Sequence, residues 1–399
     1  MSSIKVSSDI YWIGVNDRTT DLFEGLWPIT QEGVSYNAYL INDEKKAIID
    51  LAKAFKSDDF FDQIDDIVPL SEIDYVIINH MEPDHTGVLK SLKRMAPSIQ
   101  FLGSPKTRKM LEDFYGITEN IKEVSDGETL SLGKHTLKFF STPFVHWPET
   151  MMTYEETGKI LFSCDGFGGY GALRGSIFDD QCPDCAFYEQ EALRYYSNIV
   201  SKYFMPVLKA INKLSDLPIE AIAPSHGLVW RKRPERIIEL YQKWSQYGKD
   251  GGETAITLIY ASMYGNTEKM MNAMGQGISQ EGVNVEIFDA ARIHPSYILP
   301  SLWAKKGVIV GTPTYEAALF PPVADLLELA ARKAVKNKEA ALFGSFGWSG
   351  GALAHLKKIV EPLKWNIFRS YEFPGGATKE DLKNAEELGA AFARHMKSL

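Results

Sequence analysis

The sequence has 399 residues, of which 45% are hydrophobic and 24% charged, and its formal net charge is −9. This length and composition suit a globular protein of two domains. The negative charge argues against a nucleic-acid-binding protein, which needs a basic face for phosphate contacts. No segment reads as a secretory signal or a membrane span, and the three cysteines are too few for a disulfide scaffold. We therefore expect a cytoplasmic protein that does not associate with membranes.

Short apolar runs that end in polar residues dominate the first part of the chain. Residues 37–49 read as a hairpin that turns at residues 42–45. Further strands are expected at residues 74–79, 136–140, 159–162 and 219–223. Residues 187–214 carry aromatic and aliphatic side chains at three- and four-residue spacing, which predicts a helix.

Residues 245–254 are polar and rich in glycine, and they follow a helical pattern at about residues 234–244. They are predicted to be a linker between domains at residues 1–248 and 254–399. Beyond the linker, strands alternate with helices, which predicts a doubly wound parallel sheet in an α/β protein. The expected strands are 255–260, 283–288, 307–310 and 339–343, and the expected helices begin at 267, 322, 351 and 379.

Four candidate metal ligands follow the strand at residues 74–79 within six positions: His80, Glu82, Asp84 and His85. Alternate residues of an extended segment point the same way, so His80 and Glu82 can share one ion. Pro83 then redirects the chain, which lets Asp84 and His85 face a second ion.

Three further candidates, His146, Asp165 and His226, each follow a predicted strand. Adjacent strands would bring these ends to one edge of a sheet. Taken alone, His146 or His226 is more simply read as a hydrogen-bonded structural histidine. All seven residues together predict a site for two metal ions.

The cluster resembles the His-x-His-x-Asp-His motif of the metallo-β-lactamase superfamily, with Glu82 in place of the second histidine. That substitution is the signature of the flavodiiron family, and an added carboxylate suits iron. The resemblance implies a metallo-β-lactamase-like first domain with two iron ions. His80, Glu82 and His146 would hold one iron, Asp84, His85 and His226 the other, and Asp165 would bridge them. His85 is the least secure, because it is not a ligand in every member.

In the second domain, residues 261–267 lie between a predicted strand and a helix, which makes an anion site. Two later loops also follow strands, and their Tyr315 and Trp348 offer flat surfaces to an aromatic ring. The three loops resemble those of flavodoxins. A single phosphate loop without a dinucleotide fingerprint indicates noncovalent FMN. The expected contacts are Ser262, Met263, Gly265, Asn266, Thr267, Pro313, Thr314, Tyr315, Ser345, Phe346, Gly347, Trp348 and Gly350.

Other candidates carry less weight. Cys182 and Cys185 form a C-x-x-C motif, which we interpret as a plain loop and not as a redox pair or half a metal site. No second pair accompanies it, so a rubredoxin-type iron centre is not expected in this sequence. Tyr195 is a candidate catalytic residue, because flavodiiron proteins have a tyrosine beside the metal pocket near this point; helix packing is the alternative. The remaining histidines are expected at the surface: His135, His294, His355 and His395.

The resemblance covers nearly the whole chain and implies reduction of O2 to water, of NO to nitrous oxide, or both. Electrons would pass from rubredoxin or a similar carrier through FMN to the irons. It also implies a head-to-tail homodimer, or a dimer of dimers, that pairs the FMN of one chain with the irons of another. Two alternatives remain: a zinc hydrolase with a flavin domain, and an electron carrier whose first domain only docks.

Overall fold

The computed structural model describes residues 3–399, and the chain divides into two compact units. One unit comprises Met1–Tyr196 and Met205–Gln242, and the other comprises Ser197–Phe204 and Lys243–Leu399. Within the described residues, no helix combines the length and the apolar character that crossing a bilayer requires.

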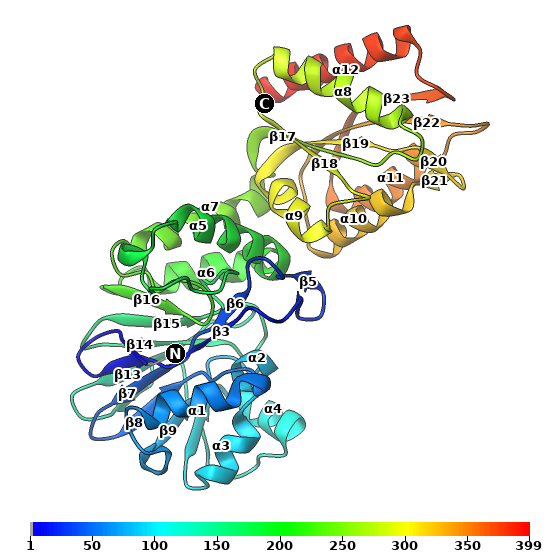
Figure 1. The fold of residues 1–399 in the computed structure, drawn as a ribbon. Helices are drawn as coiled ribbons and strands as arrows, with labels where there is room; N and C mark the ends of the chain where they lie inside the picture. The colour runs from blue at the N-terminus through cyan, green and yellow to red at the C-terminus, as the bar shows by residue number, and fades with distance from the viewer. Residues whose placement is uncertain (1–2) are drawn as a thin grey trace. The chain divides into compact units, whose positions relative to one another are not determined.

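The first unit has two sheets face to face between helical layers (Figure 1). One sheet has the order β1 (Ile4–Lys5), β2 (Ile10–Trp12), β7 (Tyr39–Asn42), β8 (Lys46–Ile49), β9 (Tyr75–Ile77), β10 (Gln100–Gly103) and β11 (Ile121–Glu123). The other has the order β12 (Thr129–Ser131), β13 (Thr136–Ser141), β14 (Met151–Glu155), β15 (Ile160–Cys164) and β16 (Ala221–Pro224). Two small ribbons form separate two-stranded sheets, β3 (Val15–Asp17) with β6 (Val34–Tyr36) and β4 (Leu22–Phe23) with β5 (Trp27–Pro28).

Helices cover both outer faces of this sandwich. They are α1 (Ser57–Asp65), α2 (Pro83–Thr86), α3 (Leu89–Met95), α4 (Pro105–Tyr115), α5 (Cys185–Tyr195), α6 (Phe204–Leu214) and α7 (Pro234–Asp250). The single helix predicted at residues 187–214 is wrong in one respect, because π and 3-10 turns over residues 196–203 separate α5 from α6. Pro206 explains the break, since it has no backbone N–H and crowds the carbonyl four residues earlier. Helix α7 also continues to Asp250, through part of the predicted linker.

The second unit has a parallel sheet in the order β18 (Val285–Asp289), β17 (Glu253–Tyr260), β19 (Lys305–Gly311), β22 (Glu339–Phe346) and β23 (Asn366–Pro374). This 2-1-3-4-5 order is that of flavodoxin-like folds, and the prediction of a doubly wound sheet is confirmed. Helices cover both faces of the sheet. One face carries α8 (Asn266–Gln280) and α12 (Lys379–Lys397), and the other carries α9 (Pro295–Ala304), α10 (Pro321–Arg332) and α11 (Ala352–Val360). A short ribbon, β20 (Thr314–Tyr315) and β21 (Ala318–Leu319), follows β19.

Apolar strands and one buried cation hold the second unit together. Ile256, Leu258 and Phe343 are fully buried, as expected for central strands covered on both faces. The buried ammonium group of Lys338 donates to three backbone carbonyls at 2.6–3.0 Å, those of Gly251, Trp303 and Lys305. Three N–H donors thus meet three acceptors, which offsets much of the cost of burying the charge.

Candidate functional site

The seven predicted metal ligands come together at one edge of the first unit. His80 and Glu82 follow β9, and the short helix α2 turns Asp84 and His85 toward them. The other three come from the second sheet: Asp165 follows β15, His226 follows β16, and His146 lies in the loop between β13 and β14. Cys164, the last residue of β15, has a left-handed φ of 54°, a rare backbone conformation that turns the chain just before Asp165.

The ligand atoms form two adjacent groups. His80, Glu82, His146 and Asp165 offer atoms that all lie within 4.8 Å of one another, and so do Asp84, His85 and His226. Asp165 joins the groups, because one of its oxygens lies 3.2 Å from His146 Nε2 and the other lies 3.1 Å from His85 Nε2. The arrangement therefore offers two cation positions with one carboxylate between them.

The second group is chemically suited to a metal ion. Its ring nitrogens and carboxylate oxygens, together with those of the joining Asp165, are buried and have no hydrogen-bond partner among the described residues: Asp84 Oδ1 and Oδ2, Asp165 Oδ1 and Oδ2, His85 Nε2 and His226 Nε2. Buried polar atoms are rarely left unsatisfied. These atoms lie 3.1–3.5 Å apart without hydrogen-bond geometry, as expected for ligands directed at a common cation.

The electrostatics of the cluster are those of imidazoles among carboxylates. Burial alone would lower the pKa of His80, but hydrogen bonds to Glu149 and Glu82 raise it to about 10. Burial also acts to lower the pKa values of the other three histidines, but neighbouring carboxylates outweigh it. Asp165 and Asp84 raise the pKa of His226 to about 10, Asp84 and Asp165 raise that of His85 to about 9, and Asp165 and Glu82 raise that of His146 to about 9. Burial acts to raise the pKa of Asp165, yet these histidines hold it well below its usual range. Protons therefore compete with a metal ion for these ring nitrogens at neutral pH.

A cleft of about 300 Å³ opens on this cluster, and its lining includes Phe23, Tyr36, Lys53 and Asp84. The rings of Phe23 and Tyr36 stand 5.5 and 5.7 Å from that of His226, at steep angles. Phe23 and Tyr36 lie far from the ligands in sequence, and no local motif marks them. The Tyr36 hydroxyl accepts a hydrogen bond from Lys53 at 3.4 Å.

Tyr195 lies where the resemblance placed it. Its ring is 1% exposed and 5.6 Å from that of His226. Burial raises the pKa of its hydroxyl well above the usual value, and the nearby Asp165 raises it further. Tyr195 is therefore a neutral phenol beside the cluster, and its catalytic role stays a prediction.

Histidines outside the cluster take structural positions. The prediction that His135 is a surface residue is wrong, because the side chain is 4% exposed and its Nδ1 lies 2.9 Å from Glu155 Oε1. A turn between β12 and β13 suggested exposure, but a carboxylate on the neighbouring strand β14 covers the ring. His294 is exposed, while His355 and His395 are half-buried, and no metal-ligand group includes them.

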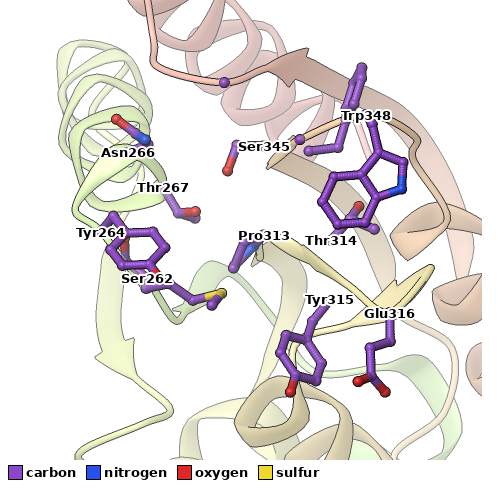
Figure 2. A pocket seen from close by; sticks show the side chains of 14 residues that line it. Ser262, Tyr264, Asn266, Thr267, Pro313, Thr314, Tyr315, Glu316, Ser345 and Trp348 are labelled. Atoms are coloured by element: carbon purple, nitrogen blue, oxygen red, sulfur yellow. The ribbon is translucent and has the colours of Figure 1, made fainter.

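A cavity of about 530 Å³ lies at the C-terminal edge of the parallel sheet in the second unit. It is lined by residues of the three predicted loops: Ser262, Met263, Asn266, Thr267, Pro313, Thr314, Tyr315, Ser345, Phe346, Gly347 and Trp348. Tyr264 and Trp348 stand on opposite sides of it, with Pro313 between them (Figure 2). Tyr264, Glu316 and Gly375 also line it and were not predicted, whereas the predicted Gly265 and Gly350 do not line it.

The cavity is chemically suited to a phosphate group and an aromatic ring. Helix α8 begins after Gly265 without a side-chain cap, so backbone N–H groups of its first turn are available to an anion. The buried Oγ1 of Thr314 has no hydrogen-bond partner among the described residues. Trp348 is 93% exposed, so its face is open to a planar ligand.

The fold and the two sites together define an oxidoreductase that joins a metallo-β-lactamase-like domain to a flavodoxin-like domain. Residues 34–227 match the ODP family of β-lactamase-like domains, and residues 258–391 match the flavodoxin family. The anaerobic nitric oxide reductase flavorubredoxin of Escherichia coli K12 is 35% identical over 398 residues, which cover 98% of this chain and 82% of that protein.

Solved structures agree with this assignment. Rubredoxin oxygen:oxidoreductase from Desulfovibrio gigas has a TM-score of 0.94 and 29% identity, covering 100% of this chain and 99% of that one. The flavodiiron protein from Giardia intestinalis also has a TM-score of 0.94, with 28% identity and coverage of 100% and 97%. The chain belongs to the flavodiiron protein family.

Proposed function

We propose that this protein reduces O2 to water, NO to nitrous oxide, or both, at a diiron site that receives electrons through FMN. Reducing one O2 takes four electrons and four protons, and coupling two NO takes two of each. Two irons and one FMN together can hold four electrons, which matches the larger demand. The names of the E. coli and D. gigas relatives, a nitric oxide reductase and an oxygen oxidoreductase, support both substrates.

The residue roles are part of this proposal. His80, Glu82 and His146 would hold one iron, and Asp84, His85 and His226 the other, with Asp165 between them. The geometry supports His85 as a ligand, because its Nε2 lies 3.1 Å from Asp165 Oδ1 and 3.5 Å from Asp84 Oδ1. Carboxylates at three of the seven positions supply the hard oxygen donors that iron accepts in both oxidation states.

The chain's own groups would shape the reaction space. The rings of Phe23, Tyr36 and Tyr195 stand around His226 and would present aromatic faces to the space beside the metals, which suits a small uncharged gas. Lys53 and the Tyr36 hydroxyl form a hydrogen-bonded pair on the cleft and could pass protons inward from solvent.

In the second unit, FMN would bind through groups without a formal positive charge. The phosphate would lie against Ser262, Asn266, Thr267 and the first turn of α8, and the ring system between the loops that carry Tyr315 and Trp348. No lysine, arginine or histidine is among the described residues that line the cavity. Backbone N–H groups and the helix dipole would therefore carry phosphate recognition.

The observation that carries the proposal is Glu82 in a complete set of converging ligands. In the hydrolases of this superfamily a histidine stands at that position. Here the carboxylate lies 3.2 Å from both His80 Nε2 and His146 Nε2. A domain that only docked a partner would have no need for seven converging ligands, six of them buried.

The test is to purify the protein without oxygen and measure its metals and flavin. About two irons and one FMN per chain are expected, with consumption of O2 or NO when reduced rubredoxin is supplied. Zinc in place of iron, reproduced from iron-supplemented cells, would point to a hydrolase. Iron and FMN without gas consumption would point to an electron carrier.

Rubredoxin or a similar small carrier as donor, and a head-to-tail homodimer or dimer of dimers, complete the proposal. The donor is supported by the name of the D. gigas protein. Reduction of bound FMN by rubredoxin in rapid-mixing experiments, and the mass of the assembly by light scattering, test these two points separately.

A further inference from the structure

A buried glutamate stands behind one of the proposed iron ligands. His80 Nδ1 lies 2.6 Å from Oε1 of Glu149, and the backbone N–H of Met81 donates to the same oxygen at 2.9 Å. The side chains of His80 and Glu149 are both 0% exposed. Glu149 was not singled out from the sequence, although it follows His146 by three residues.

This contact fixes which nitrogen of His80 faces the metals. With Nδ1 committed to Glu149, Nε2 points to the cluster, 3.2 Å from Glu82 Oε2 and 3.4 Å from Asp165 Oδ2. A second-nitrogen partner of this kind selects the tautomer and holds the ring plane of a metal-binding histidine.

Glu149 itself is held by the loop that carries His146. Thr150 Oγ1 donates to the carbonyl of Thr142 at 2.6 Å and accepts from the N–H of Val145 at 3.2 Å, which closes the loop on itself. The N–H of Met151 then donates to the carbonyl of Asn79, next to His80. One loop therefore supplies one proposed ligand and braces another.

Glu149 faces the imidazole as a hydrogen-bond acceptor. Its Oε1 lies within hydrogen-bond distance of both His80 Nδ1 and the backbone N–H of Met81, so two N–H groups converge on this one oxygen. Its Oε2 is buried and has no hydrogen-bond partner among the described residues. A carboxyl oxygen therefore stands directly behind the imidazole of His80.

The two proposed iron positions differ in what accepts a hydrogen bond from the second ring nitrogen of their histidine ligands. His226 Nδ1 lies 2.7 Å from a neutral acceptor, the carbonyl oxygen of Ser35. Asp50 lies near the His85 ring, but its oxygens accept hydrogen bonds from Asn79 N and Ser225 Oγ. Among the proposed ligands, and within the described residues, only His80 has a carboxylate hydrogen-bonded to the ring nitrogen that faces away from the cluster.

We propose that Glu149 is a positioning residue that orients His80 and makes the iron it holds the harder of the two to reduce. A carboxylate that accepts the imidazole N–H strengthens the ring as a donor, and stronger donation favours ferric over ferrous iron. The inference rests on the proposed function, since it concerns the iron that His80 would bind.

The chain contains a matched control in a second buried histidine–glutamate pair. His135 Nδ1 lies 2.9 Å from Glu155 Oε1, and Glu155 also accepts from two backbone N–H groups, those of Thr157 and Gly158. Neither residue belongs to a metal-ligand group. Glu155→Gln removes the same charge from the same kind of contact without touching the site.

The experiment compares the holo-protein with its Glu149→Gln and Glu155→Gln variants. Each is equilibrated at fixed potentials with mediators, and ferric and ferrous iron are counted by Mössbauer spectroscopy, with EPR of the mixed-valent state. Glu149→Gln keeps an acceptor oxygen but loses the charge. We expect its ferric-to-ferrous ratio to fall about tenfold at one of the two irons, which corresponds to a rise of about 59 mV. Glu155→Gln should titrate like the unmodified protein.

Iron affinity gives a second measurement in case a variant is purified with little metal. Titration of apo-protein with Fe²⁺ should show about tenfold weaker binding in Glu149→Gln and no change in Glu155→Gln. Unchanged potentials in an iron-loaded Glu149→Gln variant would overturn the proposal, and so would equal shifts in both variants. An unmodified protein that holds no iron is a different result, because it removes the proposed function before any variant is compared.

Discussion

Replacing Trp348 with alanine should weaken FMN binding without weakening the fold. Trp348 is 93% exposed in the cavity wall, so the free protein loses almost no packing when the ring is removed. If FMN covers one face of the indole, roughly half of its ~200 Å² leaves water on binding. At about 25 cal/mol per Å² this contributes about 2.5 kcal/mol, or roughly a 60-fold change in Kd.

The assay is a titration of apo-protein with FMN, followed by the quenching of flavin fluorescence. Trp348→Phe keeps an aromatic face and should lose much less affinity than Trp348→Ala. Without FMN, the thermal unfolding midpoints of the two variants should coincide with that of the unmodified chain, because substitutions at exposed positions usually cost no more than about 0.5 kcal/mol of stability. An FMN affinity unchanged by Trp348→Ala would remove this residue from the flavin site and refute the assumed stacking.

Three further substitutions separate the metal site, the fold and an uninvolved loop. Glu82→Ala should lower iron content and gas reduction by at least about tenfold while FMN stays bound; normal iron with full activity would contradict the ligand assignment. Lys338→Met leaves three buried carbonyls without a donor and, after allowance for the charge no longer buried, should destabilise the second unit by about 2–4 kcal/mol in urea unfolding. An unchanged midpoint would mean that those carbonyls find other partners. Cys182→Ser should leave iron, flavin and turnover as they are, because the thiol of Cys185, the first residue of α5, donates to the carbonyl of Asp179, and no metal-ligand group among the described residues includes either cysteine; loss of turnover would reveal a redox role.

The parts of the molecule that the sequence predicted are those encoded locally. Glu82 and its neighbours lie within six residues, so one strand end indicated both the fold family and most of the proposed ligands. The proposed phosphate loop around Thr267 was likewise visible because the strand, loop and helix that make an anion site are consecutive. Even the unpredicted Tyr264 belongs to that loop, and only the direction of its side chain was missing.

The parts that were missed depend on contacts between distant segments. Phe23 and Tyr36 line the cleft beside the proposed metal site, and both lie on small ribbons that precede every predicted ligand in the sequence. No spacing rule connects these two residues to His226. His135 was taken for a surface residue because its turn is polar, and only the pairing of β13 with β14 places Glu155 beside it. The break near Pro206 had a local signal, but the continuous apolar spacing around it outweighed that signal.

The two proposed cofactors would be retained by opposite physical means, and pH should distinguish them. A metal ion binds histidine only after the ring nitrogen loses its proton. In the metal-free site the pKa values of His80 and His226 are about 10, so protons compete with iron at neutral pH and compete more strongly as the pH falls. The flavin cavity offers N–H groups and hydroxyls, and Glu316 is its only carboxylate among the lining residues. Between about pH 8 and pH 6, the iron removed by a fixed amount of chelator should therefore increase while the Kd for FMN changes little. Parallel loss of both cofactors would mean that acid loosens the whole chain and not the histidine cluster alone.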